Sequence, residues 1–253
     1  MANSCYRYPA IVYRVQKPVL QYWEAPTAHH ASVRLHKENS LRQIKDAACP
    51  IADTGNTMTK HILVVQGHPD STTQHLCHAL AASYTQGAQD AGHSVRQIAV
   101  AELDFPLLRS QKDWETGIVP ASLLPAQEAI LRAEHIVFFF PLWLGEMPAL
   151  LKAFLEQVAR PGFAFTREKG GNPFGTKALT GRSARVVVTM GMPALVYRWY
   201  FRAHSLKSLE RNILGFVGIA PVHETLVGMV ANMKPEDTAQ WLKKLGRLGG
   251  KAQ

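Results

Sequence analysis

The stretch Phe138-Phe139-Phe140-Pro141-Leu142-Trp143-Leu144-Gly145-Glu146-Met147-Pro148 decides the fold of this chain. It continues an apolar run that begins at Ile136, is too short to span a membrane and ends at a proline, as buried parallel strands do. A loop follows, and an amphipathic helical pattern then covers residues 149–158. Doubly wound α/β proteins bind flat cofactors at such strand ends, where backbone amides and an aromatic ring are available. The alternative is an ordinary strand-to-helix turn in which Trp143 only packs.

The composition favours a globular protein. The chain has 253 residues, of which 47% are hydrophobic, and this is enough for a full core. No run of eighteen apolar residues occurs, so we expect no membrane span. Three scattered cysteines predict neither a disulfide framework nor a zinc site and favour a cytoplasmic location. The net charge of +9 lacks the interleaved basic and aromatic pattern of nucleic-acid binding, so we expect no nucleic-acid partner.

Residues 1–57 differ from the rest of the chain. They contain four prolines and show no sustained helical or strand periodicity. Met58-Thr59-Lys60, followed directly by an apolar strand, resembles a natural protein start. We therefore predict a disordered extension over 1–57 and a single folded domain over 58–253. The alternative is that residues 1–57 form an interaction arm.

Strand and helix patterns alternate after Lys60. The predicted strands cover 62–66, 94–99, 135–140, 184–190 and 222–227, and the predicted helices cover 73–91, 121–133, 148–158, 205–217 and 235–248. Two longer segments, 102–120 and 160–182, are predicted loops. Strands that alternate with helices form a parallel sheet with right-handed crossovers. The expected fold is an α/β three-layer sandwich with a five-stranded parallel sheet, of the size of flavodoxin.

Two further loops are predicted at the same edge of the sheet as the Pro141–Pro148 loop, because the carboxyl ends of parallel strands lie together. The first is Gly67-His68-Pro69-Asp70-Ser71-Thr72-Thr73-Gln74-His75, which precedes a helix. Hydroxyl groups and free amides at a helix N-terminus suit a phosphate, although the loop has neither a GxGxxG nor a P-loop pattern. Its alternative interpretation is a capping loop with Thr72 or Thr73 as the cap. The other loop is Thr189-Met190-Gly191-Met192-Pro193.

These motifs resemble the NAD(P)H:quinone oxidoreductase family, whose members have a flavodoxin-like fold. The resemblance covers residues 60–246 and rests on an apolar strand ending in His-Pro, on the block from Phe140 to Lys152 and on Phe163-Ala164-Phe165. It implies a flavin, either FMN or FAD, with NAD(P)H as the hydride donor. The implied flavin-binding residues are His68, Thr73, Gln74, His75, Leu76, Cys77, Pro141, Leu142, Trp143, Leu144, Glu156, Thr189, Met190, Gly191, Met192 and Tyr197.

The resemblance also implies catalytic residues and an acceptor. Tyr197 matches a tyrosine beside the hydride-transfer site, and His204 lies one residue beyond the expected position of an assisting histidine. Phe163 and Phe165 are the implied apolar walls for a quinone or a similar acceptor. The chain departs from the family pattern at Leu76-Cys77, in a first loop that looks two residues longer. A homodimer is implied, because a partner subunit closes the site in this family.

Three alternatives stay open. The spacing of His75 and His78 on one helix face allows a metal site, but no carboxylate or cysteine completes it, so no metal is predicted. A flavodoxin-like electron carrier would have no substrate pocket, and such carriers are usually acidic. The 21 basic and 15 acidic residues after position 57 argue against that class. The third alternative is a flavin-binding ancillary subunit of a potassium-efflux transporter.

Overall fold

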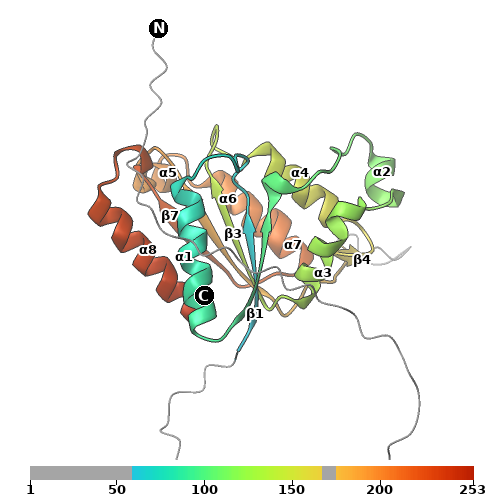
Figure 1. Cartoon of the computed structure of the whole chain (residues 1–253). Helices are drawn as coiled ribbons and strands as arrows, with labels where there is room; N and C mark the ends of the chain where they lie inside the picture. The colour runs from blue at the N-terminus through green and yellow to red at the C-terminus, as the bar shows by residue number, and fades with distance from the viewer. Residues whose placement is uncertain (1–58, 167–174) are drawn as a thin grey trace, which may run out of the picture. The chain divides into compact units, whose positions relative to one another are not determined.

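The computed structural model describes residues 59–166 and 175–253. The predictions for residues 1–57, and the centre of the predicted 160–182 loop, lie outside this part of the chain. Five parallel strands form the central sheet in the order β2-β1-β3-β6-β7 (Figure 1). Their bounds are β1 His61–Gln66, β2 Ser94–Ala99, β3 His135–Pro141, β6 Ser183–Thr189 and β7 Val222–Val227. The predicted five-stranded parallel sheet is confirmed.

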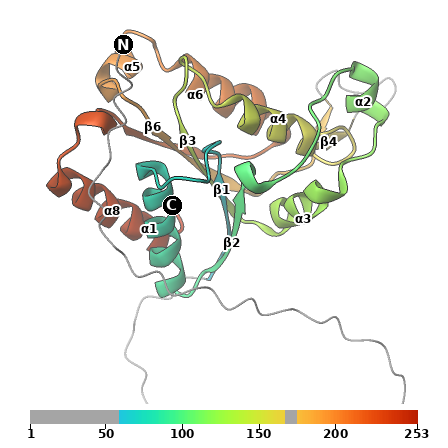
Figure 2. The same cartoon turned by 45° about the horizontal axis from the view of Figure 1, so that its top comes forward.

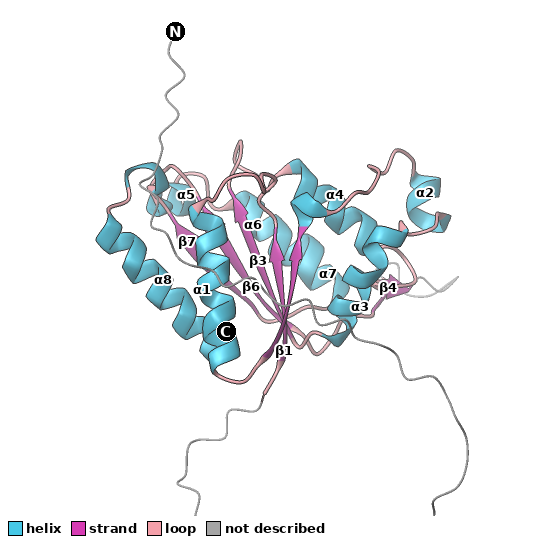
Figure 3. Cartoon of the chain, in the orientation of Figure 1, coloured by secondary structure: helices cyan, strands magenta, loops and turns pink. Residues whose placement is uncertain are grey.

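Helices cover both faces of the sheet, as Figures 2 and 3 show. On one face, α1 (Leu76–Asp90) and α8 (Pro235–Gly250) enclose the side chains of Val64, Phe139 and Val187. On the other face lie α3 (Leu124–Arg132), α4 (Ala149–Val158), α6 (His204–Ser208), the π-helical η3 (Leu209–Leu214) and α7 (Gly215–Val217). Because strand side chains alternate between faces, apolar runs such as β3 fill both cores at once. The three-layer architecture is confirmed.

The helix predicted over 73–91 begins later, at Leu76. The Asp70 carboxylate accepts hydrogen bonds from the hydroxyls of Thr72 and Thr73, both at 2.6 Å, and from the Thr72 N–H at 2.8 Å. These local bonds compete with helix formation, as short polar side chains do. Neither threonine is the helix cap, because His75 takes that position.

The two predicted loops contain regular structure. Residues 102–120 include α2 (Gln111–Thr116), whose N-cap Ser110 accepts from the Asp113 N–H, and the segment is flanked by η1 (Val100–Glu102) and η2 (Ala121–Leu123). A short antiparallel pair, β4 (Phe165–Thr166) and β5 (Thr176–Lys177), lies within 160–182. Both loop predictions missed these short helices and strands, because a helix of six residues or a strand of two residues shows little hydrophobic periodicity.

The helix expected over 205–217 is present as the continuous run of α6, η3 and α7, which begins at His204 and is π-helical over η3. A separate α5 (Ala194–Trp199), which was not predicted, precedes it. Another short turn, η4 (Val230–Asn232), follows β7. Within residues 59–166 and 175–253, no helix has the length and apolar character needed to cross a membrane.

Candidate functional site

The β1–α1 loop lies against the start of α4. The Gly67 N–H donates to the Phe139 carbonyl at 2.7 Å, and a Cβ atom at Gly67 would lie 2.7 Å from the Leu151 side chain. Glycine therefore lets the chain turn close to α4. The N–H groups of Gln74, Leu76 and Cys77 have no acceptor among the described residues, so the start of α1 presents free donors. These donors suit an anion.

Three imidazole rings gather at this loop. The ring centroids of His68 and His75 are 4.0 Å apart and nearly parallel, and the His78 centroid lies 5.0 Å from His68 and 5.6 Å from His75. Burial, together with His75 and His78, lowers the pKa of His68 to about 4. Burial and His75 also lower the pKa of His78. Despite this clustering, no group of His, Cys, Asp or Glu in the described ranges is arranged to hold a metal ion.

Asp70 organises the exposed side of this loop. Hydrogen bonds from Thr72, Thr73 and His75 hold the pKa of its carboxyl well below the usual range. The His75 Nε2 atom lies 2.9 Å from Asp70 Oδ2 and 2.9 Å from the Thr73 hydroxyl. The carboxylate is therefore ionised at neutral pH and fixes the His75 ring.

The Pro141–Pro148 loop meets the imidazole cluster through Trp143. The indole is half exposed and stands edge-on to His68, with ring centroids 6.0 Å apart. Trp143 and Glu146 exchange two backbone hydrogen bonds of 2.9 Å around Leu144 and Gly145, which both have positive φ. Leu144 is fully exposed in this left-handed conformation, which non-glycine residues rarely adopt. A strained, solvent-facing apolar residue is typical of a ligand-contacting loop.

The Thr189–Pro193 loop lies beside the other two. The Leu142 N–H donates to the Thr189 carbonyl at 2.8 Å, and the buried thiol of Cys77 bonds to the side chains of Gln66 and Thr189. Burial raises the pKa of that thiol to about 12, so Cys77 serves as a neutral contact between loops. The structure thus brings together the predicted residues of all three loops. Thr189 and Met190 are buried, whereas Gly191 is exposed and Met192 is half-buried.

Tyr197 and His204 occupy different environments. The Tyr197 side chain is only 2% exposed, and its hydroxyl shares a 2.6 Å hydrogen bond with the Ser205 hydroxyl and accepts from the Leu206 N–H at 3.3 Å. These contacts attach α5 to α6. His204 is exposed and lines a hollow of about 510 Å³ with Arg202, Lys207 and Arg211. Among the described residues, neither side chain forms a hydrogen bond or a ring contact with the imidazole cluster.

Glu156, Phe163 and Phe165 come from α4 and the segment that follows it. Glu156 is exposed on α4 and forms an ion pair with Lys152, and both residues line a hollow of about 510 Å³ together with Phe165. Phe165 is buried, with its ring 4.9 Å from that of Phe216, and Phe163 is half-buried. Phe165 therefore supports the core.

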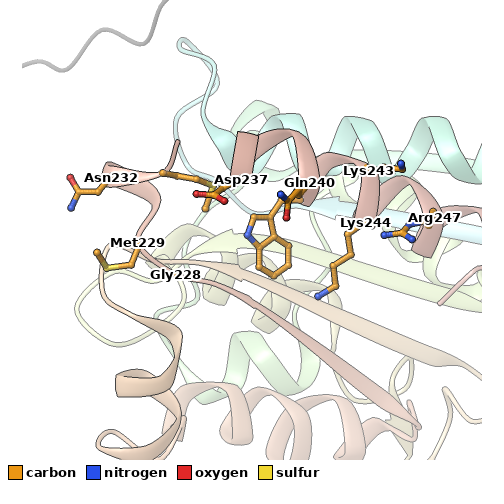
Figure 4. Close-up of a pocket in the computed structure, with 10 residues that line it drawn as sticks. Gly228, Met229, Asn232, Asp237, Gln240, Lys243, Lys244 and Arg247 are labelled. Carbon is orange, nitrogen blue, oxygen red and sulfur yellow. The ribbon is translucent and has the colours of Figure 1, made fainter. Parts of the chain in front are cut away.

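A basic pocket was missed by the sequence analysis. It has a volume of about 570 Å³ and lies between the end of β7 and α8 (Figure 4). The Lys244 ammonium group stands 4.4 Å from the ring centre of Trp241, and Lys243 and Arg247 add positive charge. Met229 connects the pocket to the third loop, because its N–H donates to the Met192 carbonyl at 3.1 Å. The available signal was the basic stretch Trp241-Leu242-Lys243-Lys244, which reads equally well as a solvated helix face.

The chain is 27% identical over 170 residues to an uncharacterized NAD(P)H oxidoreductase of Haemophilus influenzae, and the match covers 66% of this chain and 82% of that protein. An NAD(P)H:quinone oxidoreductase structure from Methanothermobacter marburgensis superposes with a TM-score of 0.64 at 22% identity, covering 76% of this chain and 96% of that one. A potassium-efflux ancillary protein, KefG of Escherichia coli, is 42% identical over 77 residues, which are 30% of this chain and 38% of that protein.

A family model described as the flavodoxin-like fold matches residues 60–248. This range contains all five strands of the sheet and the three loops at its carboxyl edge. The chain therefore belongs to the flavodoxin-like fold family.

Proposed function

We propose that this protein is a flavin-dependent NAD(P)H oxidoreductase that passes hydride from NAD(P)H through a bound flavin to quinones or similar acceptors. The observation that carries the proposal is the convergence of three ligand-type loops at the carboxyl edge of the sheet, joined by the His68–Trp143 and Leu142–Thr189 contacts. The Haemophilus influenzae relative, named an NAD(P)H oxidoreductase, supports the same activity class. The reducing setting of a cytoplasmic enzyme is part of this proposal.

The proposed phosphate end lies at the β1–α1 loop. The free N–H groups of Gln74, Leu76 and Cys77 and the His68 and His75 rings would bind the flavin phosphate. The Thr73 hydroxyl donates to Asp70 in this structure and would have to turn away from it to take part. Whether the cofactor is FMN or FAD is decided by the mass of the released molecule.

The proposed ring end lies between the other two loops. Trp143 would border the flavin, and Pro141 and Leu142 would shape the wall. The N–H groups of Leu144, Gly145, Gly191 and Met192 have no acceptor among the described residues, whereas those of Leu142 and Trp143 are already engaged. The backbone donors proposed for the flavin edge are therefore at 144–145 and 191–192, where they would stabilise charge as an oxyanion hole does. A flavin supplies the hydride-accepting ring atom, and the protein supplies orientation and electrostatics.

A homodimer is part of the proposal. Helix α5 and the residues after it leave Leu195, Trp199 and Tyr200 each at least 70% exposed, which is unusual for large apolar side chains. A second copy would cover them and supply a wall for the acceptor. Light scattering that returned a monomer of 28.0 kDa with full activity would contradict this part.

The direct test is the cofactor content of the purified full chain. We expect a yellow protein with about one flavin per subunit, released on denaturation and identified by mass. Colourless protein that gains no absorbance with either FMN or FAD would overturn the proposal.

The second candidate is a transporter ancillary subunit, favoured by the KefG match over 77 residues. Such a subunit would bind flavin but need its transporter to act. Rapid flavin reduction by NAD(P)H in the isolated protein separates the two, and the electron-carrier alternative is separated in the same way.

A further inference from the structure

The basic pocket between β7 and α8 has the size and the lining of a ligand site. Its volume of about 570 Å³ lies within the range of roughly 300–1,000 Å³ that small-molecule sites occupy. Trp241, Met229 and Met233 give it an apolar surface, and the side chains of Asn232 and Gln240 add polar groups (Figure 4). This mixture suits a ligand that has a flat apolar part and several polar groups.

Positive charge dominates this pocket. Lys243, Lys244 and Arg247 line it, and none of the three forms an ion pair in the part of the chain that the structure describes. The acid among the lining residues is Asp237, which lies in the first turn of α8, where the helix dipole stabilises a carboxylate. Three cations and one carboxylate leave a surplus of two positive charges, which matches the charge of about −1.5 to −2 on a phosphate monoester at pH 7.

Lys244 is held in place by its neighbour. Its ammonium group stands 4.4 Å from the centre of the Trp241 ring, in a cation–π contact that a solvated helix face does not require. Because this contact already restrains the side chain, less conformational entropy is lost when an anion binds. Arg247 follows three residues later in α8, so the two cations lie on the same side of the helix. An ammonium group beside a guanidinium group is a favourable arrangement for a phosphate.

The pocket adjoins the third loop of the proposed flavin site. The Met229 N–H donates to the Met192 carbonyl at 3.1 Å, and a Cβ atom at Gly228 would lie 2.5 Å from the Ala194 nitrogen. The end of β7 therefore packs directly against this loop. On the same loop, Gly191 and Met192 carry the N–H groups proposed for the flavin edge. A long ligand that crosses the loop contacts the flavin with one end and the basic pocket with the other.

NADPH differs from NADH by one phosphate monoester, on the 2′-hydroxyl of its adenosine ribose. In dinucleotide-binding proteins a basic side chain near that position accommodates this phosphate. The proposed function places the nicotinamide ring at the flavin, so the adenosine end has to lie outside the flavin-ring site. The basic pocket begins at the third loop and carries the positive charge that the extra phosphate of NADPH requires.

We propose that the basic pocket binds the adenosine end of NADPH, with Lys244 and Arg247 on its 2′-phosphate, and that this chain therefore prefers NADPH to NADH. The inference rests on the proposed function. Lys244 and Arg247 contact the nucleotide far from its nicotinamide ring, so they determine specificity and take no part in hydride transfer. Binding in the pocket changes no covalent bond.

The experiment compares NADPH with NADH in the flavin-loaded full chain. Stopped-flow measurement of flavin reduction over a range of nucleotide concentrations gives a second-order rate constant for each nucleotide. Calorimetry with adenosine 2′,5′-bisphosphate and with AMP measures binding to the pocket without hydride transfer. The variants are Lys244→Gln, Arg247→Gln and Lys244→Arg, which keeps the charge. Lys207→Gln is the matched control, because it removes one charge from the other basic hollow, beside α6.

We expect the rate constant for NADPH to exceed that for NADH by about tenfold or more, and the bisphosphate to bind more tightly than AMP by a similar factor. Lys244→Gln and Arg247→Gln should each lower the rate constant for NADPH by about three- to thirtyfold and leave that for NADH within about twofold, because only the 2′-phosphate loses a charge-assisted hydrogen bond. Lys244→Arg should retain the preference for NADPH, and Lys207→Gln should behave as the parent protein.

Equal rate constants for the two nucleotides, or a preference for NADPH that survives both glutamine substitutions, overturns the inference. An equal loss of the preference in Lys207→Gln also overturns it, because the effect would then come from the net charge and not from the pocket. Failure of the proposed function is distinguishable. If neither nucleotide reduces the flavin, that function fails, and bisphosphate binding that depends on Lys244 and Arg247 still supports the pocket. Absence of bisphosphate binding overturns the inference in either case.

Discussion

At the residue scale, Tyr197 has a structural role that the sequence did not reveal. A tyrosine eight residues after a strand end predicts contact with the bound ring only by resemblance. In the structure its buried hydroxyl joins α5 to α6 through Ser205 and the Leu206 N–H. A buried hydroxyl bonded on both sides stabilises the fold chiefly because removing it leaves its partners unsatisfied.

We expect Tyr197→Phe to cost about 1–2 kcal/mol of unfolding free energy, because Ser205 and the Leu206 N–H lose their partner. Ser205→Ala breaks the same bond from the other side and should cost a similar amount. Chemical denaturation of the flavin-free protein measures both. A Tyr197→Phe variant with unchanged stability and a slower hydride step would instead restore the predicted catalytic role.

At the element scale, α1 and α8 approach each other over glycines. A Cβ atom at Gly249 would lie 2.0 Å from the Tyr84 carbonyl oxygen, and one at Gly87 would lie 2.0 Å from the Gly246 carbonyl oxygen. Both distances are too short for any side chain. A Cβ atom at Gly246 itself would meet its nearest neighbour, Ser83 Oγ, at 3.4 Å, which is ordinary contact.

We predict that Gly249→Ala destabilises the protein by more than about 3 kcal/mol, because the helices must separate. Gly246→Ala in the same helix should be neutral or stabilise by up to about 1 kcal/mol through helix propensity. Thermal melting compares the pair. Equal effects of the two substitutions would show that the close approach is not required.

His135, at the start of β3, makes stability depend on pH. Burial lowers its pKa to about 4, from an ordinary value near 6.5, and its Nδ1 lies 2.8 Å from the Ser183 hydroxyl. The unfolded chain then binds the proton more readily than the folded one. Stability should be complete above about pH 6.5 and fall as pH decreases towards 4, by roughly 3 kcal/mol at most for this group.

Denaturation at pH 7.5, 6, 5 and 4.5 checks this prediction, with His135→Gln as the variant that lacks the titrating ring. The slope below pH 6.5 should become shallower in that variant. The pKa of His68 is also lowered, so part of the dependence of stability on pH should persist in His135→Gln. An unchanged slope in His135→Gln would remove His135 as a cause.

The elements differ in how well the sequence predicted them. The strands β1, β2 and β7 and the buried run of β3 were predicted within one or two residues, because period-two and continuous apolar patterns are strong signals. The start of α1 was predicted three residues too early, because Thr72 and Thr73 donate hydrogen bonds to Asp70 instead of joining the helix. Hydrophobic periodicity carries no information about such side-chain bonds. The imidazole cluster depends on ring orientations across a turn, which sequence spacing cannot supply.

At the scale of the whole molecule, the sheet places three loops of the domain side by side, and the matched range 60–248 contains them all. We therefore predict that deletion of residues 1–57 leaves flavin content and quinone reduction intact. The measurement is cofactor absorbance and steady-state activity of the purified truncation beside the full chain. Loss of folding in the truncation would show that the first 57 residues are integral.

The most direct test of the central claim is anaerobic stopped-flow mixing of the purified, flavin-loaded full chain with NADH or NADPH, followed by a quinone. We expect the absorbance of the oxidised flavin to be lost within the turnover time with at least one nicotinamide, and to return when the quinone is added. Flavin that stays oxidised with both nicotinamides would contradict the account, because the isolated protein would then bind the cofactor without being an NAD(P)H oxidoreductase.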